Sequence, residues 1–286
     1  MTNIKIAYCN FWEGFNYKTD IFHKIISKVY NIIIDYKNPD LIIHSVFKNG
    51  ASVTHYNQNI PRICYIGENI KPLYKNNTMY FSYDEESDIN VYFPIWQKIC
   101  MEKNEYIPNL YNKIKHSTFE KFCSFVVSNP NNIDRNNLFT SLNDYKHVDS
   151  LGRFNNNNTL LSKYTDEDTW HENKINLLRD NKFKFNICFE NTYTTGYITE
   201  KIMDSFLTGS IPIYKGANDV DKWFNNDSFI NCNDYNNEDI IQLIKELDSN
   251  ESLFNKYYNQ PLFDAYQIIQ LFNSLNNIEK RILNCI

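Results

Sequence analysis

The sequence predicts an α/β protein built from two parallel-sheet halves. Apolar runs of strand length alternate with segments of helical period along most of the 286 residues, which is the pattern of an open α/β sheet. The alternation starts afresh near residues 115–122 with the run Phe122–Val127. A chain of this length can form two domains of about 100–150 residues each. We therefore expect one domain over 1–117, a second over 118–262, and a final helix over 263–286.

The first half carries this alternation from its first residues. Ile4–Cys9 is an apolar run of strand length, and the apolar residues from Ile21 to Tyr30 recur at the spacing of a helix. Arg62–Ile66 is a further short strand, closed by Gly67-Glu68-Asn69. The other strands expected here are Ile32–Tyr36, Leu41–Phe47, Met79–Tyr83 and Val91–Trp96.

The second half repeats the pattern with longer helices. Asn155–Asn158 is expected to be a polar surface loop. The strands expected in this half are Phe122–Val127, Val148–Leu151, Phe185–Phe189, Ile211–Tyr214 and Ser228–Asn231. The expected helices are Arg135–Tyr145, His171–Asn181, Thr199–Leu207, Ile240–Tyr258 and Asp264–Leu283.

One stretch, residues 185–216, joins a strand, a polar loop, a helix and a second strand in the sequence FNICFENTYTTGYITEKIMDSFLTGSIPIYKG. Gly209 is expected to end the helix. Loop and helix are long enough for a crossover connection, so the two strands should be parallel. In such units ligands bind at the carboxyl ends of the strands, where helix N-termini offer free N–H groups. The polar residues that follow Phe189 occupy that end.

Composition excludes several classes of protein. The net charge is −5, whereas a protein that binds nucleic acid by neutralising phosphates is usually basic. The seven cysteines are scattered singly, which predicts buried reduced thiols and a reducing compartment. No apolar run approaches the ~20 residues of a membrane span, and the N-terminus does not resemble a signal peptide. We therefore expect a soluble, cytoplasmic protein that binds no nucleic acid and has no transmembrane segment, with peripheral association with a membrane left open.

Motifs for phosphate and metal binding are sparse. With seven glycines the chain has no glycine-rich phosphate loop, so a phosphate would be bound by Arg, Lys, hydroxyls and helix N-termini. Arg135 begins a predicted helix, where a bound anion would offset its unfavourable interaction with the dipole. The six histidines form no metal-like cluster, and Asp84–Asp88 is expected to be a solvated loop. The DxD spacing of Asp219–Asp221 is too short a pattern to predict a metal site.

Three glutamates are candidate functional carboxylates, and each also has an ordinary structural explanation. Glu190 and Glu200 flank one polar loop, but a carboxylate at a helix N-terminus is also simply favourable for the dipole. Glu68 follows a buried strand and could be only an exposed turn residue. Lys201 could be a solvated charge and Tyr197 a packing residue. The residues alone leave these alternatives open.

The stretch resembles the donor-binding signature of the α-1,3/α-1,4-fucosyltransferases, glycosyltransferase family 10. The signature residues here are Phe189-Glu190-Asn191, Tyr197-Ile198-Thr199-Glu200-Lys201 and Ile211-Pro212-Ile213-Tyr214-Lys215-Gly216. Two further segments support the resemblance: FVVSNPNNIDRNNLFTSLNDYKHVDSLGRF, which contains Ser128, Asn129 and Arg135, and RICYIGENIKP, which contains Glu68. The resemblance spans most of the chain and is closest to the bacterial forms.

The resemblance implies a GT-B fold, in which two Rossmann-like domains face each other across a cleft. Residues 1–117 would bind the acceptor, residues 118–262 would bind GDP-fucose, and the helix over 263–286 would pack back on the first domain. The implied reaction is an inverting transfer of L-fucose to a GlcNAc hydroxyl of an oligosaccharide, with an α-1,3 linkage expected first. Such a reaction serves oligosaccharide biosynthesis and protein glycosylation.

The resemblance also implies roles for single residues. An inverting transfer needs one base, and Glu68 is the expected base. Arg135 and Lys201 would hold the diphosphate together with a hydroxyl of Tyr197, and Glu200 would accept hydrogen bonds from the ribose. The remaining expected donor-binding residues are Ser128, Asn129, Glu190, Asn191 and Thr199, of which Glu190 and Asn191 would line the fucose subsite. No cofactor or metal is required by this arrangement, although a divalent cation could stimulate transfer.

Two alternatives remain at this stage. The chain could be a GT-B transferase that uses another nucleotide sugar, or an inactive homologue that binds a glycan or a nucleotide. The sequence lacks the stem and membrane anchor of the animal enzymes, and the heptad repeats and basic amphipathic tail of some bacterial ones, so attachment to a membrane by those routes is not expected. The acceptor and the oligomeric state are not assigned.

Overall fold

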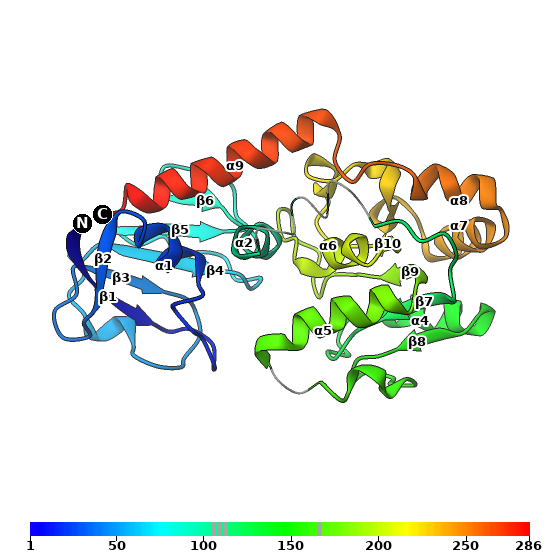
Figure 1. Cartoon of the computed structure of the whole chain (residues 1–286), viewed down its shortest axis with the longest axis horizontal. Coiled ribbons are helices and arrows are strands. Elements are labelled where there is room, and N and C mark those ends of the chain that lie inside the picture. The colour runs from blue at the N-terminus through cyan, green and yellow to red at the C-terminus, as the bar shows by residue number, and fades with distance from the viewer. Residues whose placement is uncertain (104–106, 108–109, 111–113, 165–166) are drawn as a thin grey trace. The chain divides into compact units, whose positions relative to one another are not determined.

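The computed structural model of the chain describes residues 1–103, 107, 110, 114–164 and 167–286 (Figure 1). The chain divides into two compact units. The first unit comprises Met1–Asn104, Thr195–Tyr197 and Ile269–Ile286, and the second comprises Glu105–Thr194 and Ile198–Ile268.

The first unit is built on a six-stranded sheet in the order β2-β1-β3-β4-β5-β6, in which every neighbouring pair is parallel. Its central strands are apolar on both faces, as expected for a parallel sheet that is covered by helices. The strands are β1 (Thr2–Cys9), β2 (Tyr30–Ile34), β3 (Leu41–His44), β4 (Arg62–Ile66), β5 (Thr78–Ser82) and β6 (Asn90–Tyr92). The helices are α1 (Ile21–Ile26) and α2 (Ile95–Glu102), with a 3-10 turn over Val53–His55.

Most of the last helix, α9 (Ala265–Leu283), belongs to the first unit. Its apolar positions Ile278 and Ile282 are fully buried. Polar contacts flank this apolar stripe: Glu279 pairs with Lys28 at 2.8 Å, and the Ser274 hydroxyl lies 3.2 Å from the Gln97 side chain. The end of the chain therefore packs on elements formed by its beginning.

The second unit is built on a five-stranded sheet in the order β11-β10-β9-β7-β8, again parallel throughout. Its core joins aromatic and branched side chains of the sheet to helices, as in the stacked pair Phe125 and Phe139. The strands are β7 (Lys121–Phe125), β8 (Val148–Ser150), β9 (Phe183–Ile187), β10 (Ile211–Tyr214) and β11 (Ile230–Asn231). The helices are α4 (Ile133–Tyr145), α5 (Glu167–Asp180), α6 (Glu200–Leu207), α7 (Asn237–Ser249) and α8 (Glu251–Tyr258). Short 3-10 turns lie at η2 (Thr159–Leu161), η3 (Val220–Lys222), η4 (Asn226–Ser228) and η5 (Cys232–Asp234).

The predicted strand–loop–helix–strand unit is confirmed. β9, α6 and β10 follow one another, and β9 and β10 are parallel with Phe185 opposite Ile211. Gly209 follows the end of α6 with φ of 76°, the left-handed conformation that favours glycine after a helix. A Cβ at this position would also lie 2.7 Å from the His116 ring.

Several predicted elements differ from the structure. The helix expected from Ile21 to Tyr30 ends at Ile26, and Tyr30 begins β2. The strand expected over Ser228–Asn231 begins only at Ile230, because Asn226–Ser228 forms the turn η4. The single helix expected over Ile240–Tyr258 is two helices, because Asn250 has the extended φ and ψ of −116° and 99° and caps α8 through a 3.1 Å bond from the Leu253 amide to its side chain. The strand expected over Val91–Trp96 ends at Tyr92, since Pro94 begins the turn into α2.

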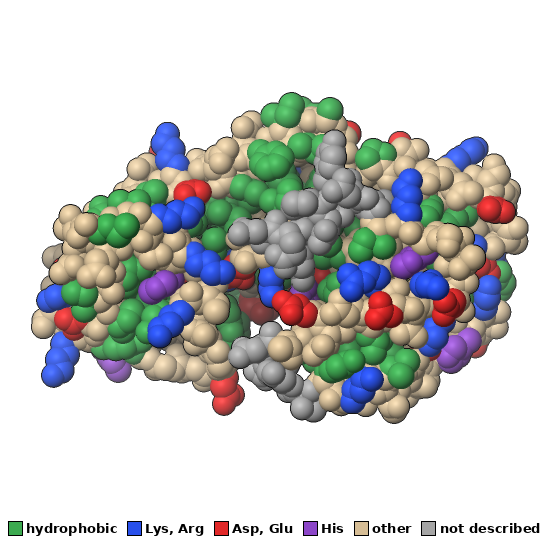
Figure 2. Space-filling view, viewed as in Figure 1, with side chains coloured by type: hydrophobic (Ala, Val, Ile, Leu, Met, Phe, Trp, Pro, Cys, Tyr) green, Lys and Arg blue, Asp and Glu red, His purple; other side chains and the backbone are tan. Residues whose placement is uncertain are grey.

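Other expectations from composition can be compared directly. All seven cysteines are free and six of them are buried. In the part of the chain that the structure describes, no helix has the length and apolar character that crossing a membrane demands. On the face shown in Figure 2, basic side chains are scattered among acidic ones rather than gathered into one field.

Candidate functional site

The loop after β9 is organised around the buried carboxylate of Glu190, whose side chain is fully shielded from solvent. The carboxylate accepts hydrogen bonds from the Thr199 amide at 2.8 Å and from the Thr199 hydroxyl at 2.7 Å. It also pairs with the Lys201 ammonium at 3.2 Å. A Cβ at Gly216 would come within 2.6 Å of Glu190 Cγ, so the glycine that ends the stretch makes room for this side chain. Glu190 thus ties the start of α6 to the ends of β9 and β10.

Burial dominates the electrostatics of this carboxylate. It raises the pKa of Glu190 above its ordinary value, although Lys201 and the hydrogen bonds from Thr199 act in the opposite direction. The Lys201 side chain stays 23% exposed, so its ammonium faces both Glu190 and solvent. The Lys201 ammonium therefore lies at the N-terminus of α6, where the helix dipole also favours an anion.

Arg135 is the second cation of this region, and its side chain is almost completely buried. Asn132 caps α4 by accepting a 3.0 Å bond from the Arg135 amide, which places the guanidinium under the loop. The guanidinium donates to the Asn191 side chain at 3.0 Å and to the carbonyl oxygens of Phe189 and Asn129. Its Nε–H is buried and has no partner among the described residues. Burial lowers the pKa of Arg135 against the opposing influence of Tyr193 and Glu190.

A cluster on α5 and α6, which sequence reasoning did not find, lies behind Lys201. Asp204 is buried and pairs with Lys174, and it also accepts from His171 Nε2 at 2.9 Å. Burial of Asp204 favours its protonated form, but Lys174 and His171 prevail and lower its pKa. Burial opposes ionisation of Glu200 as well, and Lys201 and Lys174 still lower its pKa. Glu200 is therefore an ionised carboxylate at neutral pH, ready to accept hydrogen bonds.

No sequence signal marked this cluster, because its members come from different predicted helices. The pair Asp134 and Lys215 was missed because its members lie 81 residues apart in the sequence, although the Lys215 ammonium lies 2.8 Å from the Asp134 carboxylate. The spacing of Lys174 from His171, three residues along one helix, would have been the only pointer to a shared face.

A pocket of about 600 Å³ opens beside the ends of β7 and β8. Ser128 lines it, together with Leu151, Arg153, Tyr164 and Trp170. A Cβ at Gly152 would lie 2.0 Å from the Val127 carbonyl oxygen, so glycine is needed for the two strand ends to approach each other here. Apolar and aromatic walls with a few polar groups are typical of a small-molecule site.

The other predicted donor-binding residues occupy different environments. Asn129 is exposed, and its side chain accepts from the Asn131 amide at 2.9 Å. Asn191 is exposed, and its side-chain oxygen accepts a hydrogen bond from Arg135. Tyr197 belongs to the first unit, where its ring meets Tyr83 edge-on. The neighbouring Gly196 has φ of 76°, and a Cβ there would lie 2.3 Å from the Tyr83 carbonyl oxygen.

Glu68 lies in the first unit, in the turn after β4, and is exposed. No hydrogen bond or ion pair from another described side chain reaches its carboxylate. The neighbouring Tyr65 hydroxyl is buried and also has no partner in the described chain. The Tyr65 hydroxyl lies at the same end of β4 as Glu68, since a Cβ at Gly67 would come within 3.0 Å of the hydroxyl oxygen.

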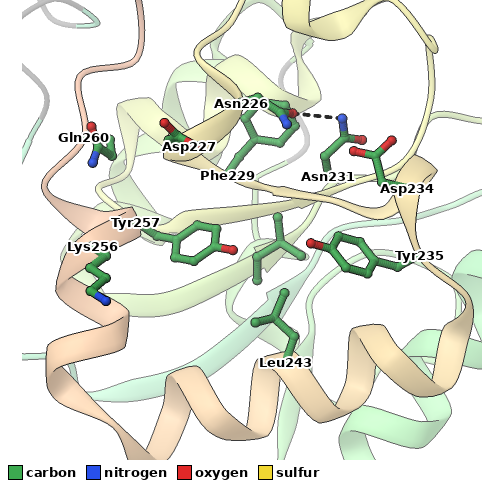
Figure 3. A pocket seen from close by; sticks show the side chains of 11 residues that line it. Asn226, Asp227, Phe229, Asn231, Asp234, Tyr235, Leu243, Lys256, Tyr257 and Gln260 are labelled. Carbon is green, nitrogen blue, oxygen red and sulfur yellow. Dashed lines mark hydrogen bonds between the residues drawn. The ribbon is translucent and has the colours of Figure 1, made fainter.

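No group of three His, Cys, Asp or Glu side chains is arranged to hold a metal ion within the described ranges. A second pocket of the second unit, between β11, α7 and α8, is lined by none of the site residues expected from the sequence (Figure 3). It is therefore separate from the candidate donor site.

Two Rossmann-like parallel α/β units, with cations and hydroxyls collected at the carboxyl ends of β7, β9 and β10, place the chain in the GT-B class of glycosyltransferase folds. The chain belongs to glycosyltransferase family 10, the fucosyltransferases. The profile of the C-terminal part of that family matches residues 115–282, and the profile of the alpha-(1,3)-fucosyltransferase FucT N-terminal domain matches residues 6–98.

Individual relatives agree with this membership. The chain is 30% identical to the alpha-(1,3)-fucosyltransferase FucT of Helicobacter pylori over 301 residues, which cover 91% of this chain and 60% of FucT. It is 32% identical over 185 residues to a putative fucosyltransferase of Acanthamoeba polyphaga mimivirus, covering 63% of this chain and 30% of the viral protein. A crystal structure of an alpha1,3-fucosyltransferase with GDP-fucose superposes with a TM-score of 0.73 and 26% identity, covering 98% of this chain and 91% of that one. The chain thus spans less than two thirds of the length of these two sequence relatives.

Proposed function

We propose that the protein is an inverting α-1,3-fucosyltransferase that moves L-fucose from GDP-fucose to a GlcNAc hydroxyl of an oligosaccharide. The observation that carries this proposal is the connected network at the start of α6. Glu190, Thr199 and Lys201, all within the family's donor signature, bond to one another at 2.7–3.2 Å. A solved relative of the same fold was crystallised with GDP-fucose, which supports the choice of donor.

The diphosphate is assigned to Lys201 and Arg135. Lys201 presents an ammonium at a helix N-terminus, where both the charge and the dipole favour an anion. Arg135 keeps one buried N–H without a partner in the described chain, which is costly unless a ligand satisfies it. Glu200, ionised at neutral pH because of Lys201 and Lys174, is suited to accept the ribose hydroxyls. The pocket beside Ser128, with the Tyr164 and Trp170 rings, suits the guanine base because aromatic faces stack.

The remaining signature residues receive supporting roles in this proposal. Glu190 acts by holding Lys201 and Thr199, since its buried carboxylate is already occupied by them. Asn191 is anchored by Arg135 and is exposed, so it is the residue we assign to the fucose subsite. Asn129 supports Arg135 through its carbonyl oxygen. Tyr197 remains a candidate donor contact through its hydroxyl.

Glu68 is the proposed base. The acceptor oxygen attacks C1 of fucose from the face opposite to the diphosphate, the bond to GDP breaks with its electron pair leaving on GDP, and the acceptor proton goes to the Glu68 carboxylate. An exposed carboxylate without a partner in the described chain is free to take a proton at the moment of transfer. Neutralisation of GDP by Lys201 and Arg135 makes it a good leaving group, so the proposal assigns no role to a general acid, a cofactor or a metal. Stimulation by a divalent cation stays an open expectation of the family resemblance.

The acceptor is assigned to an aromatic cluster at the end of β1. Trp12 is 37% exposed and meets Phe15 and Phe47 edge-on. The buried ammonium of Lys98, paired with Asp20 at 2.9 Å, lies 5.8 Å from the Trp12 ring centroid and fixes that ring by a cation–π contact.

The position of this cluster supports the assignment. β1, β3 and β4 are consecutive parallel strands, so the ends of β1 and β4, near Trp12 and Glu68, lie at one edge about 10 Å apart. An exposed indole face suits the C–H face of a sugar ring. The base and the acceptor ring would thus be held by one rigid sheet.

Activity with several nucleotide sugars tests the proposal. The protein is incubated with N-acetyllactosamine and, in separate reactions, with GDP-fucose, GDP-mannose and a dTDP-sugar. We expect transfer from GDP-fucose alone. Transfer only from another donor would show a different GT-B transferase, and binding of GDP-fucose without any transfer would show an inactive homologue. We place the protein in the cytoplasm, because all of its thiols are free, and fractionation of cells that express it checks this.

A further inference from the structure

A second pocket of about 360 Å³ lies in the second unit, between β11, the turns η4 and η5, and the helices α7 and α8 (Figure 3). This volume is within the range of small-molecule sites. The donor and acceptor assignments use none of its residues. The pocket therefore has no role in the proposed transfer. All of its lining residues belong to the second unit.

The pocket combines an apolar floor with two facing tyrosines. Phe229 and Ile230 are buried at its base, and Leu243 of α7 packs beside them. The rings of Tyr235 and Tyr257 approach from opposite sides with their hydroxyls directed toward one another (Figure 3). Tyr235 is 43% exposed, so its side chain is accessible from solvent.

Several polar groups around this space are available to a ligand. Within the described residues, the hydroxyls of Tyr235 and Tyr257 and the carboxylates of Asp227 and Asp234 take part in no hydrogen bond or ion pair. Asn231, in contrast, is held by its side-chain bond to Asn226 at 2.9 Å. Burial raises the pKa of Tyr257, and Tyr235 and Asp227 act in the same direction, which agrees with their gathering around one space.

The charges at the pocket disfavour an anionic ligand. Two carboxylates, Asp227 and Asp234, line it against a single ammonium, Lys256. Lys256 and Tyr257 also lie in the last turn of α8, where the helix dipole is negative. A tightly held cation is disfavoured as well, because no group of three acidic, His or Cys side chains is arranged for one in the described chain.

A neutral ligand with many hydroxyl groups and an apolar face fits these features. Its hydroxyls can donate to the two carboxylates and exchange hydrogen bonds with the two tyrosine hydroxyls. Its C–H face can lie on the ring of Tyr235 or Tyr257 and on the apolar floor. We propose that this pocket is a saccharide-binding site, distinct from the donor and acceptor sites and able to hold a glycan on the second unit.

Direct binding tests the proposal without any need for catalysis. Saturation-transfer-difference NMR on the full chain uses lactose, N-acetyllactosamine and maltose as probes. We expect at least one probe to bind, and we expect Tyr257→Ala and Tyr235→Ala each to weaken that binding at least about tenfold. Tyr257→Phe, which keeps the ring, should weaken it less. The control is Tyr266→Ala, since Tyr266 is 72% exposed on α9 and does not line the pocket.

The outcomes separate this site from the acceptor cluster. Signal that arises at the acceptor cluster is removed by Trp12→Ala and kept in Tyr257→Ala. Saccharide signals that are identical in the wild type, Tyr235→Ala and Tyr257→Ala would overturn the proposal, as would binding of GDP or inorganic phosphate that is lost in Tyr257→Ala. Urea unfolding midpoints identify a variant that has lost its fold; if Tyr257→Ala has done so, the exposed Tyr235 and the variant Tyr257→Phe decide the question.

Discussion

Substitution of Glu190 by glutamine should cost little stability at pH 7, even though its carboxylate makes three contacts. The buried charge itself opposes folding, since burial raises the pKa of Glu190 above its ordinary 4.5. Because the raised pKa means that the folded protein favours the neutral acid, a neutral amide of the same shape gives up little net interaction. We expect Glu190→Gln to change the free energy of unfolding by no more than about 1 kcal/mol at pH 7, the net contribution of a typical hydrogen bond. Glu190→Ala should cost about 2–4 kcal/mol, because it leaves the buried Thr199 amide without its 2.8 Å partner and removes packing.

The difference in the free energy of unfolding between the wild type and Glu190→Gln should depend on pH in one direction. An acid with a raised folded-state pKa contributes its full stability below the unfolded pKa of about 4.5, and this contribution declines as the pH rises through the folded pKa. Glutamine does not titrate. The stability of the wild type minus that of Glu190→Gln should therefore be larger at pH 4.5 than at pH 7.5.

Urea unfolding at these two pH values measures the stability effect, and calorimetry with GDP measures the functional one. Lys201 loses its charged anchor in Glu190→Gln, so we expect GDP to bind about tenfold more weakly, or about 1.4 kcal/mol, while the fold is retained. A loss above 3 kcal/mol at pH 7, or a difference that does not vary with pH, would refute the burial argument. Unchanged GDP affinity would refute the proposed link between Glu190 and the donor.

Four further outcomes follow from the same contacts. Glu68→Gln should lower kcat at least about 100-fold in steady-state transfer assays and leave the calorimetric Kd of GDP unchanged; a rate near that of the wild type would rule Glu68 out as the base. Lys201→Met should raise the Kd of GDP about 10–100-fold, as expected for loss of a charged hydrogen bond, and an unaltered Kd would remove it from the diphosphate site. Asp204→Asn should lower the free energy of unfolding by about 3 kcal/mol at pH 7. Because the pKa of Asp204 is lowered in the folded protein, its carboxylate stabilises the fold above about pH 3.8, and this stabilisation is lost as the pH falls through the folded-state pKa. The variant should therefore unfold less steeply with acid, and acid titration followed by circular dichroism checks the lost stability and the weaker pH dependence. Gly196→Ala should lower the thermal midpoint, since φ is 76° and the new Cβ would meet the Tyr83 carbonyl oxygen, and a midpoint equal to that of the wild type would contradict this contact.

Local sequence pattern predicted the fold well because parallel strands and crossover helices carry their signals within short windows. The unit of β9, α6 and β10 is an example: apolar runs, the stop at Gly209 and the crossover length all lie within residues 185–216. The break at Asn250 was missed because apolar residues keep the helical spacing on both sides of it. Only the capping bond to the Leu253 amide shows that one helix ends and another begins there.

The burial of the site residues could not be predicted from the sequence. Glu190 and Glu200 both flank the same polar loop, and nothing local tells which one is enclosed. The structure buries Glu190 under Thr199 and Lys201 and leaves Glu200 with a quarter of its side chain exposed. Arg135 was expected to hold the diphosphate, and its guanidinium also donates to the backbone carbonyl oxygens of Asn129 and Phe189. Such partners lie 6 and 54 residues away, beyond the reach of a periodicity argument.

These contacts change how the donor signature should be understood. Arg135 joins the loop after β7 to the loop after β9, and Glu190 joins the loop after β9 to the start of α6. Arg135 and Glu190, both expected to touch the donor, therefore make most of their hydrogen bonds to other groups of the protein. Lys201 and Glu200, at the outer side of this network, keep the exposed charge. Substitution of Glu190 should consequently act on GDP through the placement of Lys201, whereas Arg135 keeps one N–H without a partner among the described residues for the diphosphate. Stability and GDP affinity therefore need to be measured separately in the same variants.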